Sequence, residues 1–69
     1  MKLSARNQIA GRVTKLTKGP ATAVVELDVN GLRLVSSITA QAASELGLTE
    51  GTEVTAIIKA SDVILATGD

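Results

Sequence analysis

Two runs of alternating apolar and polar residues meet at Asn30-Gly31, and this arrangement constrains the fold more than any other feature of the sequence. Asn-Gly between such runs is the strongest short-range signal for a β-hairpin with a two-residue turn. The first run, ATAVVELDV (21–29), places four apolar side chains on one face: Ala23, Val25, Leu27 and Val29. The second run, LRLVSSIT (32–39), is the expected partner strand, with an inner face of Leu32, Leu34, Ser36 and Ile38.

The segment before this hairpin is expected to be a third strand. NQIAGRVTKL (7–16) alternates with a period of two, which places Ile9, Gly11 and Val13 on one face. A glycine inside a strand indicates a bulge or a close backbone approach. Pro20 in KGPA (18–21) fixes its own φ and favours a turn into the next strand.

The segment after the hairpin breaks the period of two. AQAASELGL (40–48) is rich in helix-forming residues, with Thr39 as a plausible N-cap and Gly47 as a plausible terminator, so we expect a helix of about two turns. After a turn at 49–51, the β-branched run TEVTAIIKA (52–60) and the segment DVILAT (62–67) are expected to be strands.

The resulting order, β-β-β-α-β-β, predicts an all-β protein: a small five-stranded, OB-like barrel with one short helix. We expect residues 1–69 to form a single domain. A chain of 69 residues buries a small core, and such scaffolds often gain stability from disulfides, a metal or oligomerisation. The sequence has no Cys and no His, which argues against the first two. Since 45% of the residues are hydrophobic and the mean hydropathy is +0.30, we expect a homo-oligomer.

Composition argues against several classes of function. Seven basic and seven acidic residues give a net charge of zero, and no aromatic residue is present to stack on bases, so a nucleic-acid partner is not expected. No apolar run is long enough for a membrane span or a signal peptide, which makes the cytoplasm the expected location. Without His, Cys or an obvious carboxylate pair, we predict no enzymatic activity, no metal site formed by protein ligands and no cofactor.

Three segments carry hydrogen-bond donors that suit an anion. They are SARNQ (4–8), SSITA (36–40), where a helix is expected to begin, and KAS (59–61) at a junction of two expected strands. Each also has an ordinary explanation: a polar tail, a helix N-cap and a solvated lysine in a turn. An unprotonated tetrahedral oxyanion only accepts hydrogen bonds, so its site requires donors and at least one cation. The candidate donors are Ser4, Arg6, Thr39, Lys59 and Ser61, provided that the fold and assembly bring them together.

Three longer stretches resemble one known family. SARNQIAGRVTKL, ITAQAASELGLTEG and VTAIIKASDVILA are similar to sequences of the molbindins, small cytoplasmic molybdate-binding proteins built from the Mop or TOBE domain. The resemblance spans Leu3 to Ala66, and SARN and KASDV are its most specific parts. It implies an OB-like fold and a hexamer, a trimer of dimers, that binds molybdate or tungstate between subunits for storage or buffering.

The resemblance also implies a set of oxyanion contacts. They are Ser4, Ala5 through its backbone, Arg6, Thr39, Lys59, Ala60 and Ser61. The family often has a second hydroxyl three positions into the helix, where this chain has Ala42, whose N–H remains as a candidate donor. Two alternatives stay open at this point: a nucleic-acid-binding OB-like module, suggested by the element order, and a purely structural oligomerisation module, suggested by the apolar content.

Overall fold

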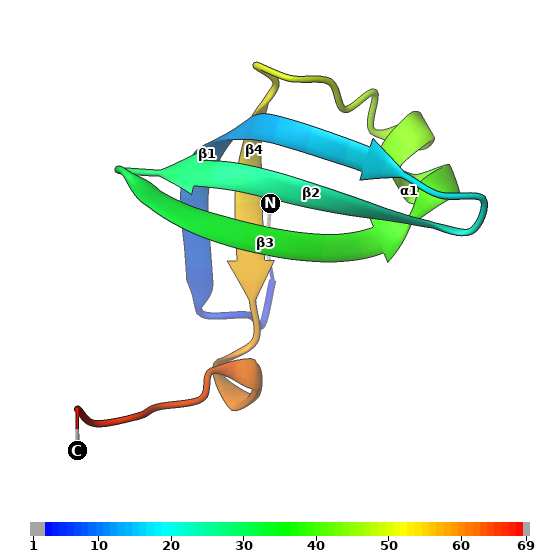
Figure 1. The fold of residues 1–69 in the computed structure, drawn as a ribbon. Coiled ribbons are helices and arrows are strands. Elements are labelled where there is room, and N and C mark those ends of the chain that lie inside the picture. Colours follow the sequence, from blue (N-terminus) through cyan, green and yellow to red (C-terminus); the bar gives the residue numbers. More distant parts are fainter. Residues whose placement is uncertain (1–2, 69) are drawn as a thin grey trace.

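A computed structural model describes residues 3–68 as one antiparallel sheet with a short helix (Figure 1). The strands are β1 (Asn7–Lys18), β2 (Thr22–Val29), β3 (Leu32–Thr39) and β4 (Glu53–Ile58), and their order in the sheet is β3-β2-β1-β4. Helix α1 (Ala40–Glu45) lies between β3 and β4, and a 3₁₀ turn, η1 (Ala60–Asp62), follows β4. The predicted class, all-β with one short helix, is confirmed.

The hairpin predicted at Asn30-Gly31 forms as expected. β2 and β3 pair without a register shift from Thr22↔Thr39 to Val29↔Leu32. Asn30 and Gly31 have φ values of +51° and +86°, which suit the type I′ turn that connects strands of right-handed twist.

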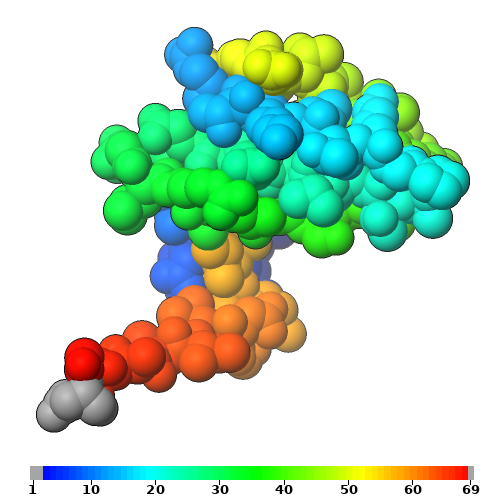
Figure 2. Space-filling view, viewed as in Figure 1, coloured from blue at the N-terminus to red at the C-terminus, as the bar shows by residue number. Residues whose placement is uncertain are grey.

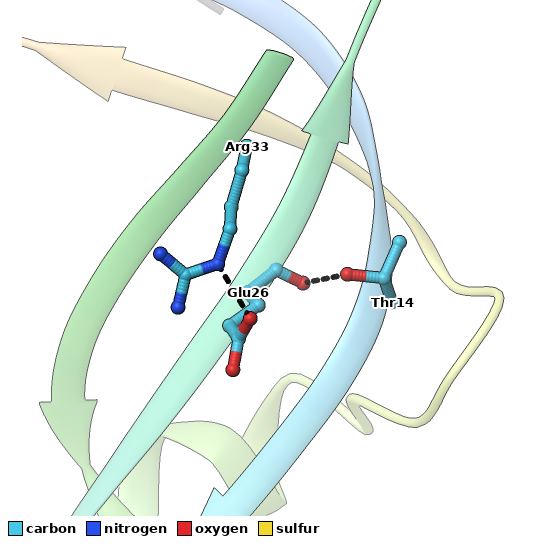
Figure 3. A network of polar contacts seen from close by, with 3 residues as sticks. All are labelled: Thr14, Glu26 and Arg33. Carbon is cyan, nitrogen blue, oxygen red and sulfur yellow. Dashed lines mark hydrogen bonds and ion pairs between the residues drawn. The ribbon is translucent and has the colours of Figure 1, made fainter. Parts of the chain in front are cut away.

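The long strand β1 belongs to two ladders. Its first half, Asn7–Arg12, pairs with β4, and its second half, Arg12–Lys18, pairs with β2. A register shift between Val13 and Lys15 marks a bulge, and the Thr14 hydroxyl there donates to the carbonyl of Glu26 at 3.1 Å (Figure 3). Bulges bend a strand and increase its twist, so this one turns β1 from one partner toward the other, as Figure 1 shows.

Gly11 provides the close backbone approach that the sequence predicted. A Cβ at this position would lie 2.9 Å from Cγ2 of Val29 and 3.0 Å from the carbonyl oxygen of Asp28. Only a residue without a side chain fits where β1 passes β2 so closely.

Helix α1 begins and ends as predicted. The Thr39 hydroxyl accepts from the N–H of Ala42 at 3.0 Å, which is an N-cap hydrogen bond. Gly47, at φ +65°, follows the C-cap, and its N–H donates to Ser44 O while the N–H of Leu48 donates to Ala43 O. This pair of bonds is the Schellman motif that ends many helices.

The core is small and apolar, as expected for this length. Its members are Val13, Ala23, Val25, Leu27, Val29, Ala43 and Leu48, and no polar side chain is buried within residues 3–68. Leu32 was predicted to face inward, but it is 72% exposed. It lies on the edge strand β3 beside the hairpin tip, where no element of the described part of the chain covers it.

The fifth strand, predicted at 62–67, is absent from the described part of the chain. β4 ends at Ile58, η1 begins at Ala60, and residues 63–68 pair with no strand described here. Figure 2 shows this orange-to-red segment projecting from the body, with Ile64 92% and Leu65 89% exposed. A strand requires a neighbour for its backbone hydrogen bonds, and this segment has none among residues 3–68. The helix within residues 3–68 is too short to span a membrane.

Candidate functional site

The SARN and KAS segments converge at one end of the β1–β4 ladder. The pairing runs without a shift from Arg12↔Glu53 to Asn7↔Ile58, which is the last pair. The next residue on each side is a cation, Arg6 before β1 and Lys59 after β4. The hydroxyl residues Ser4 and Ser61 lie three positions beyond the last pair on their respective segments. The fold thus brings together two of the three donor segments, which are more than fifty residues apart in the sequence.

The two cations have no carboxylate partner within residues 3–68. The ion pairs in this part of the chain are Arg12–Glu53 at 3.0 Å and Arg33–Glu26 at 2.7 Å, and neither involves Arg6 or Lys59. Both cations are exposed to solvent. Two exposed cations that follow the last strand pair make this end of the ladder suited to an anion rather than to a cation.

Local hydrogen bonds shape both segments at this end. The turn η1 is closed by Asp62 N–H to Lys59 O at 2.9 Å and by Val63 N–H to Ala60 O at 3.3 Å. On the other segment, the Gln8 side chain donates to Ala5 O at 3.4 Å. The donors in these bonds are backbone N–H groups and the Gln8 amide, so the bonds use none of the hydroxyl, guanidinium or ammonium donors of the two segments.

Asn7 links the two segments, a role that sequence reasoning did not assign. Its Nδ2 donates to the carbonyl of Ile58 at 3.1 Å, across 51 residues of sequence. The amide in SARNQ was the available signal, but its partner depends on which strands pair, and that is not visible in a local pattern.

Thr39 lies away from these donors. It pairs with Thr22, beside the turn that joins β1 to β2, whereas Arg6 precedes the opposite end of β1 (Figure 1). Its hydroxyl oxygen accepts from Ala42, so the hydroxyl proton is available to a further acceptor. The Ala42 N–H, the further candidate donor, already donates to the Thr39 hydroxyl in the single chain, so it could serve the anion only by sharing or giving up this bond.

One chain therefore presents two groups of donors at opposite ends of β1. The first, which we call the ladder-end group, comprises Ser4, Ala5, Arg6, Lys59, Ala60 and Ser61. The second is Thr39 at the start of α1. Apart from Ala5, which is half-buried, all of these residues are exposed. A site that uses both groups requires two copies of the chain.

A polar pocket elsewhere in the molecule does not suit an anion. It has a volume of about 500 Å³ and its lining includes Arg12, Asp28 and Glu53. The guanidinium of Arg12 is already paired with Glu53, and Asp28 adds a further negative charge. No cluster of three metal-ligating His, Cys, Asp or Glu side chains occurs in the described residues.

Comparisons with known proteins agree with this architecture. A family model described as the TOBE domain matches residues 3–65. Molybdenum-pterin-binding protein 1 from Clostridium pasteurianum is 46% identical over 66 residues, which cover 94% of this chain and 97% of that protein.

Two solved structures are also similar. A molybdate binding protein from Sporomusa ovata has a TM-score of 0.93 and 34% identity, with 97% of this chain and 100% of that chain covered. The cytoplasmic molybdate-binding protein ModG, in a form with molybdate bound, has a TM-score of 0.89 and 42% identity, with 93% of this chain and 46% of that chain covered. These likenesses confirm the OB-like fold, and the names of these relatives describe binding proteins rather than enzymes.

Proposed function

Since the chain belongs to the molbindin (Mop) group of the TOBE domain family, we propose that it binds molybdate, without catalysis, at sites between copies of itself. The observation that carries the proposal is the ladder-end group, in which the cations Arg6 and Lys59 flank the last strand pair with no carboxylate partner within residues 3–68. A dianion with four acceptor oxygens matches two cations surrounded by hydroxyls and N–H groups.

Each residue of the proposed site has a chemical role. Arg6 and Lys59 supply positive charge, and Ser4, Thr39 and Ser61 supply hydroxyl donors. Ala5 and Ala60 contribute through the backbone and, having small side chains, leave room for a large anion. A site lined by donors rejects a protonated phosphate, because the phosphate O–H would face another donor. Sulfate carries no such proton, so its exclusion depends on the size of the cavity.

The assembly is part of this proposal. Thr39 joins the ladder-end group only if a second copy supplies it, because the two lie at opposite ends of β1. The exposed side chains of Ile64 and Leu65 would also be covered by another copy. An apolar groove of about 290 Å³, whose lining includes Leu34, Ile38, Val54 and Ala56, offers further surface for such contacts. We propose a homo-hexamer, arranged as a trimer of dimers.

The biological role that follows is storage or buffering of molybdate in the cytoplasm. Tungstate has the same charge and tetrahedral shape, so the site would accept it as well. Neither nucleic acid nor a membrane is needed as a partner in this role.

Calorimetric titration of the apo protein with sodium molybdate, sulfate and phosphate tests the function. We expect saturable heat with molybdate and much weaker binding of the other two anions. Light scattering on the same samples measures the mass of the assembly. No heat with molybdate at micromolar protein would refute the function, and a monomer that binds molybdate tightly would refute the shared site.

A further inference from the structure

We infer that Asn7 is a positioning residue for oxyanion binding: its side-chain amide holds the end of β4 against the start of β1 and thereby sets Lys59 beside Arg6. This inference rests on the proposed function, because it concerns the geometry of the same site. Asn7 itself is not proposed to touch the anion.

The geometry of the Asn7 contact explains how it acts at a distance. Nδ2 of Asn7 donates to the carbonyl oxygen of Ile58 at 3.1 Å, and the contact is partly buried. This carbonyl belongs to the same planar peptide group as the N–H of Lys59. A hydrogen bond to the Ile58 carbonyl therefore restricts the direction in which the chain leaves β4. That direction determines where Lys59 and the turn η1 lie.

The position of Asn7 in the ladder makes this restraint important. Two side-chain hydrogen bonds connect β1 with β4 within the described residues, Arg12–Glu53 at one end of the ladder and Asn7–Ile58 at the other. The end of a ladder frays more readily than its middle. Here the next residue on each segment is a cation, so the relative placement of the two charges depends on how firmly this end of the ladder is held.

The turn η1 cannot provide the same restraint. Its two backbone bonds lie within residues 59–63 and fix the shape of the KAS segment, not its placement relative to SARN. The Gln8 bond to Ala5 likewise stays within its own segment. The bond from Asn7 is the side-chain contact that joins the two segments at this end.

Asn7→Ala tests the inference, and Arg12→Ala is its matched control because it removes the side-chain bond at the far end of the same ladder. By analogy with hydrogen bonds that orient metal ligands, we expect Asn7→Ala to weaken molybdate binding about tenfold or more. Arg12→Ala should leave the dissociation constant unchanged. Amide hydrogen exchange of apo Asn7→Ala should be faster at Arg6, Lys59 and Ala60 than in the parent, and saturating molybdate should slow it again.

A cross-linked background keeps the test decisive if Asn7→Ala folds poorly. Gln8 and Ile57 are directly paired, and the chain has no natural Cys, so Gln8→Cys with Ile57→Cys can form one defined disulfide near the ladder end. In the oxidised background, Asn7→Ala should cost much less affinity than it does without the cross-link, and a reductant should restore the full loss.

The outcomes separate this inference from the function on which it rests. If the parent protein fails to bind molybdate, the proposed function is wrong. If the parent binds but Asn7→Ala binds equally well, or loses the same affinity with and without the disulfide, the positioning role is wrong. Unchanged hydrogen exchange at Lys59 and Ala60 would also overturn it.

Discussion

Replacing Lys59 with alanine should separate anion binding from folding. Lys59 is exposed, and its ammonium makes no hydrogen bond or ion pair within residues 3–68. Its carbonyl accepts from the N–H of Asp62 at 2.9 Å, and alanine keeps that backbone bond. Because the side chain makes no contact of this kind in the described residues, the melting temperature of the apo protein should stay close to that of the parent.

The loss of affinity can be estimated from the charge removed. A hydrogen bond to a charged group contributes about 1.5–3 kcal/mol. At about 1.4 kcal/mol for each factor of ten, Lys59→Ala should weaken molybdate binding about 10- to 150-fold. The stabilisation of the protein by saturating molybdate should shrink accordingly, because it depends on the ratio of ligand concentration to dissociation constant.

Calorimetry and thermal unfolding, each with and without molybdate, measure the two effects separately. Lys15→Ala is the matched control, since Lys15 is an exposed lysine on β1 that lies near Glu26 rather than in the ladder-end group. It should bind molybdate like the parent. The reasoning would be refuted if Lys59→Ala bound molybdate with the dissociation constant of the parent. It would also be refuted if the apo variant were less stable and this loss of stability accounted for its weaker binding.

Three further changes test the fold and the assembly. Gly11→Ala should destabilise the protein by about 1–3 kcal/mol in denaturant unfolding, because the new Cβ meets a backbone carbonyl at 3.0 Å, and an unchanged midpoint would contradict the close approach. The hydrogen bond from Arg33 lowers the pKa of Glu26 below its usual 4.5, so this pair stabilises the fold above pH 4.5 and its contribution disappears as pH falls through the lowered pKa. Thermal scans of Arg33→Ala and the parent should therefore differ near neutral pH and converge in acid, and a difference that persists in acid would rule this out. Ile64→Ser, at a side chain 92% exposed in the single chain, should lower the mass of the assembly in light scattering but leave the far-UV spectrum intact, whereas an unchanged mass would exclude this residue from the interface.

The elements with local signals were predictable from the sequence. Asn30-Gly31 specifies its hairpin because both residues adopt positive φ, and Thr39 and Gly47 fix the two ends of α1 through their own hydrogen bonds and φ. In each case the residues that form the sequence motif are also the ones that adopt the required φ or make the capping hydrogen bond. Tertiary packing is not needed to interpret them.

The errors in the fold prediction concern what surrounds a residue or segment in the folded protein, rather than its local conformational preference. Alternation correctly assigned the inner face of β2. On β3 it placed Leu32 on the inner face, but it could not show that this residue lies beyond the elements that cover the sheet. The apolar segment 62–67 has the composition of a strand and no strand partner among residues 3–68. Strand formation depends on a neighbouring strand, and the presence of such a neighbour is not visible in a local sequence pattern.

The sequence could propose the donor segments but not their arrangement. Convergence of SARN with KAS follows from the pairing of β1 with β4, a contact between the two ends of the chain. The separation of Thr39 follows from the pairing of β3 with β2. Both facts are non-local, so residue types alone could propose an anion site but could not divide it into two groups. The hydrogen bond of Asn7 was hidden for the same reason.

The proposed division of the site between copies has a thermodynamic consequence. If molybdate is held by the ladder-end group of one chain and Thr39 of another, ligand binding and subunit association are linked and each must strengthen the other. Apparent affinity should then fall on dilution below the dissociation constant of the assembly, and added molybdate should shift the mass distribution toward larger species. Thr39→Val removes one donor and also the N-cap bond from Ala42, so its apo melting temperature is measured alongside. It should weaken the coupling by more than any loss of apo stability accounts for, while the ladder-end group keeps both of its cations. A site complete within one chain would instead show the same affinity at every protein concentration, and the placement of Thr39 and Lys59 at opposite ends of β1 argues against that case.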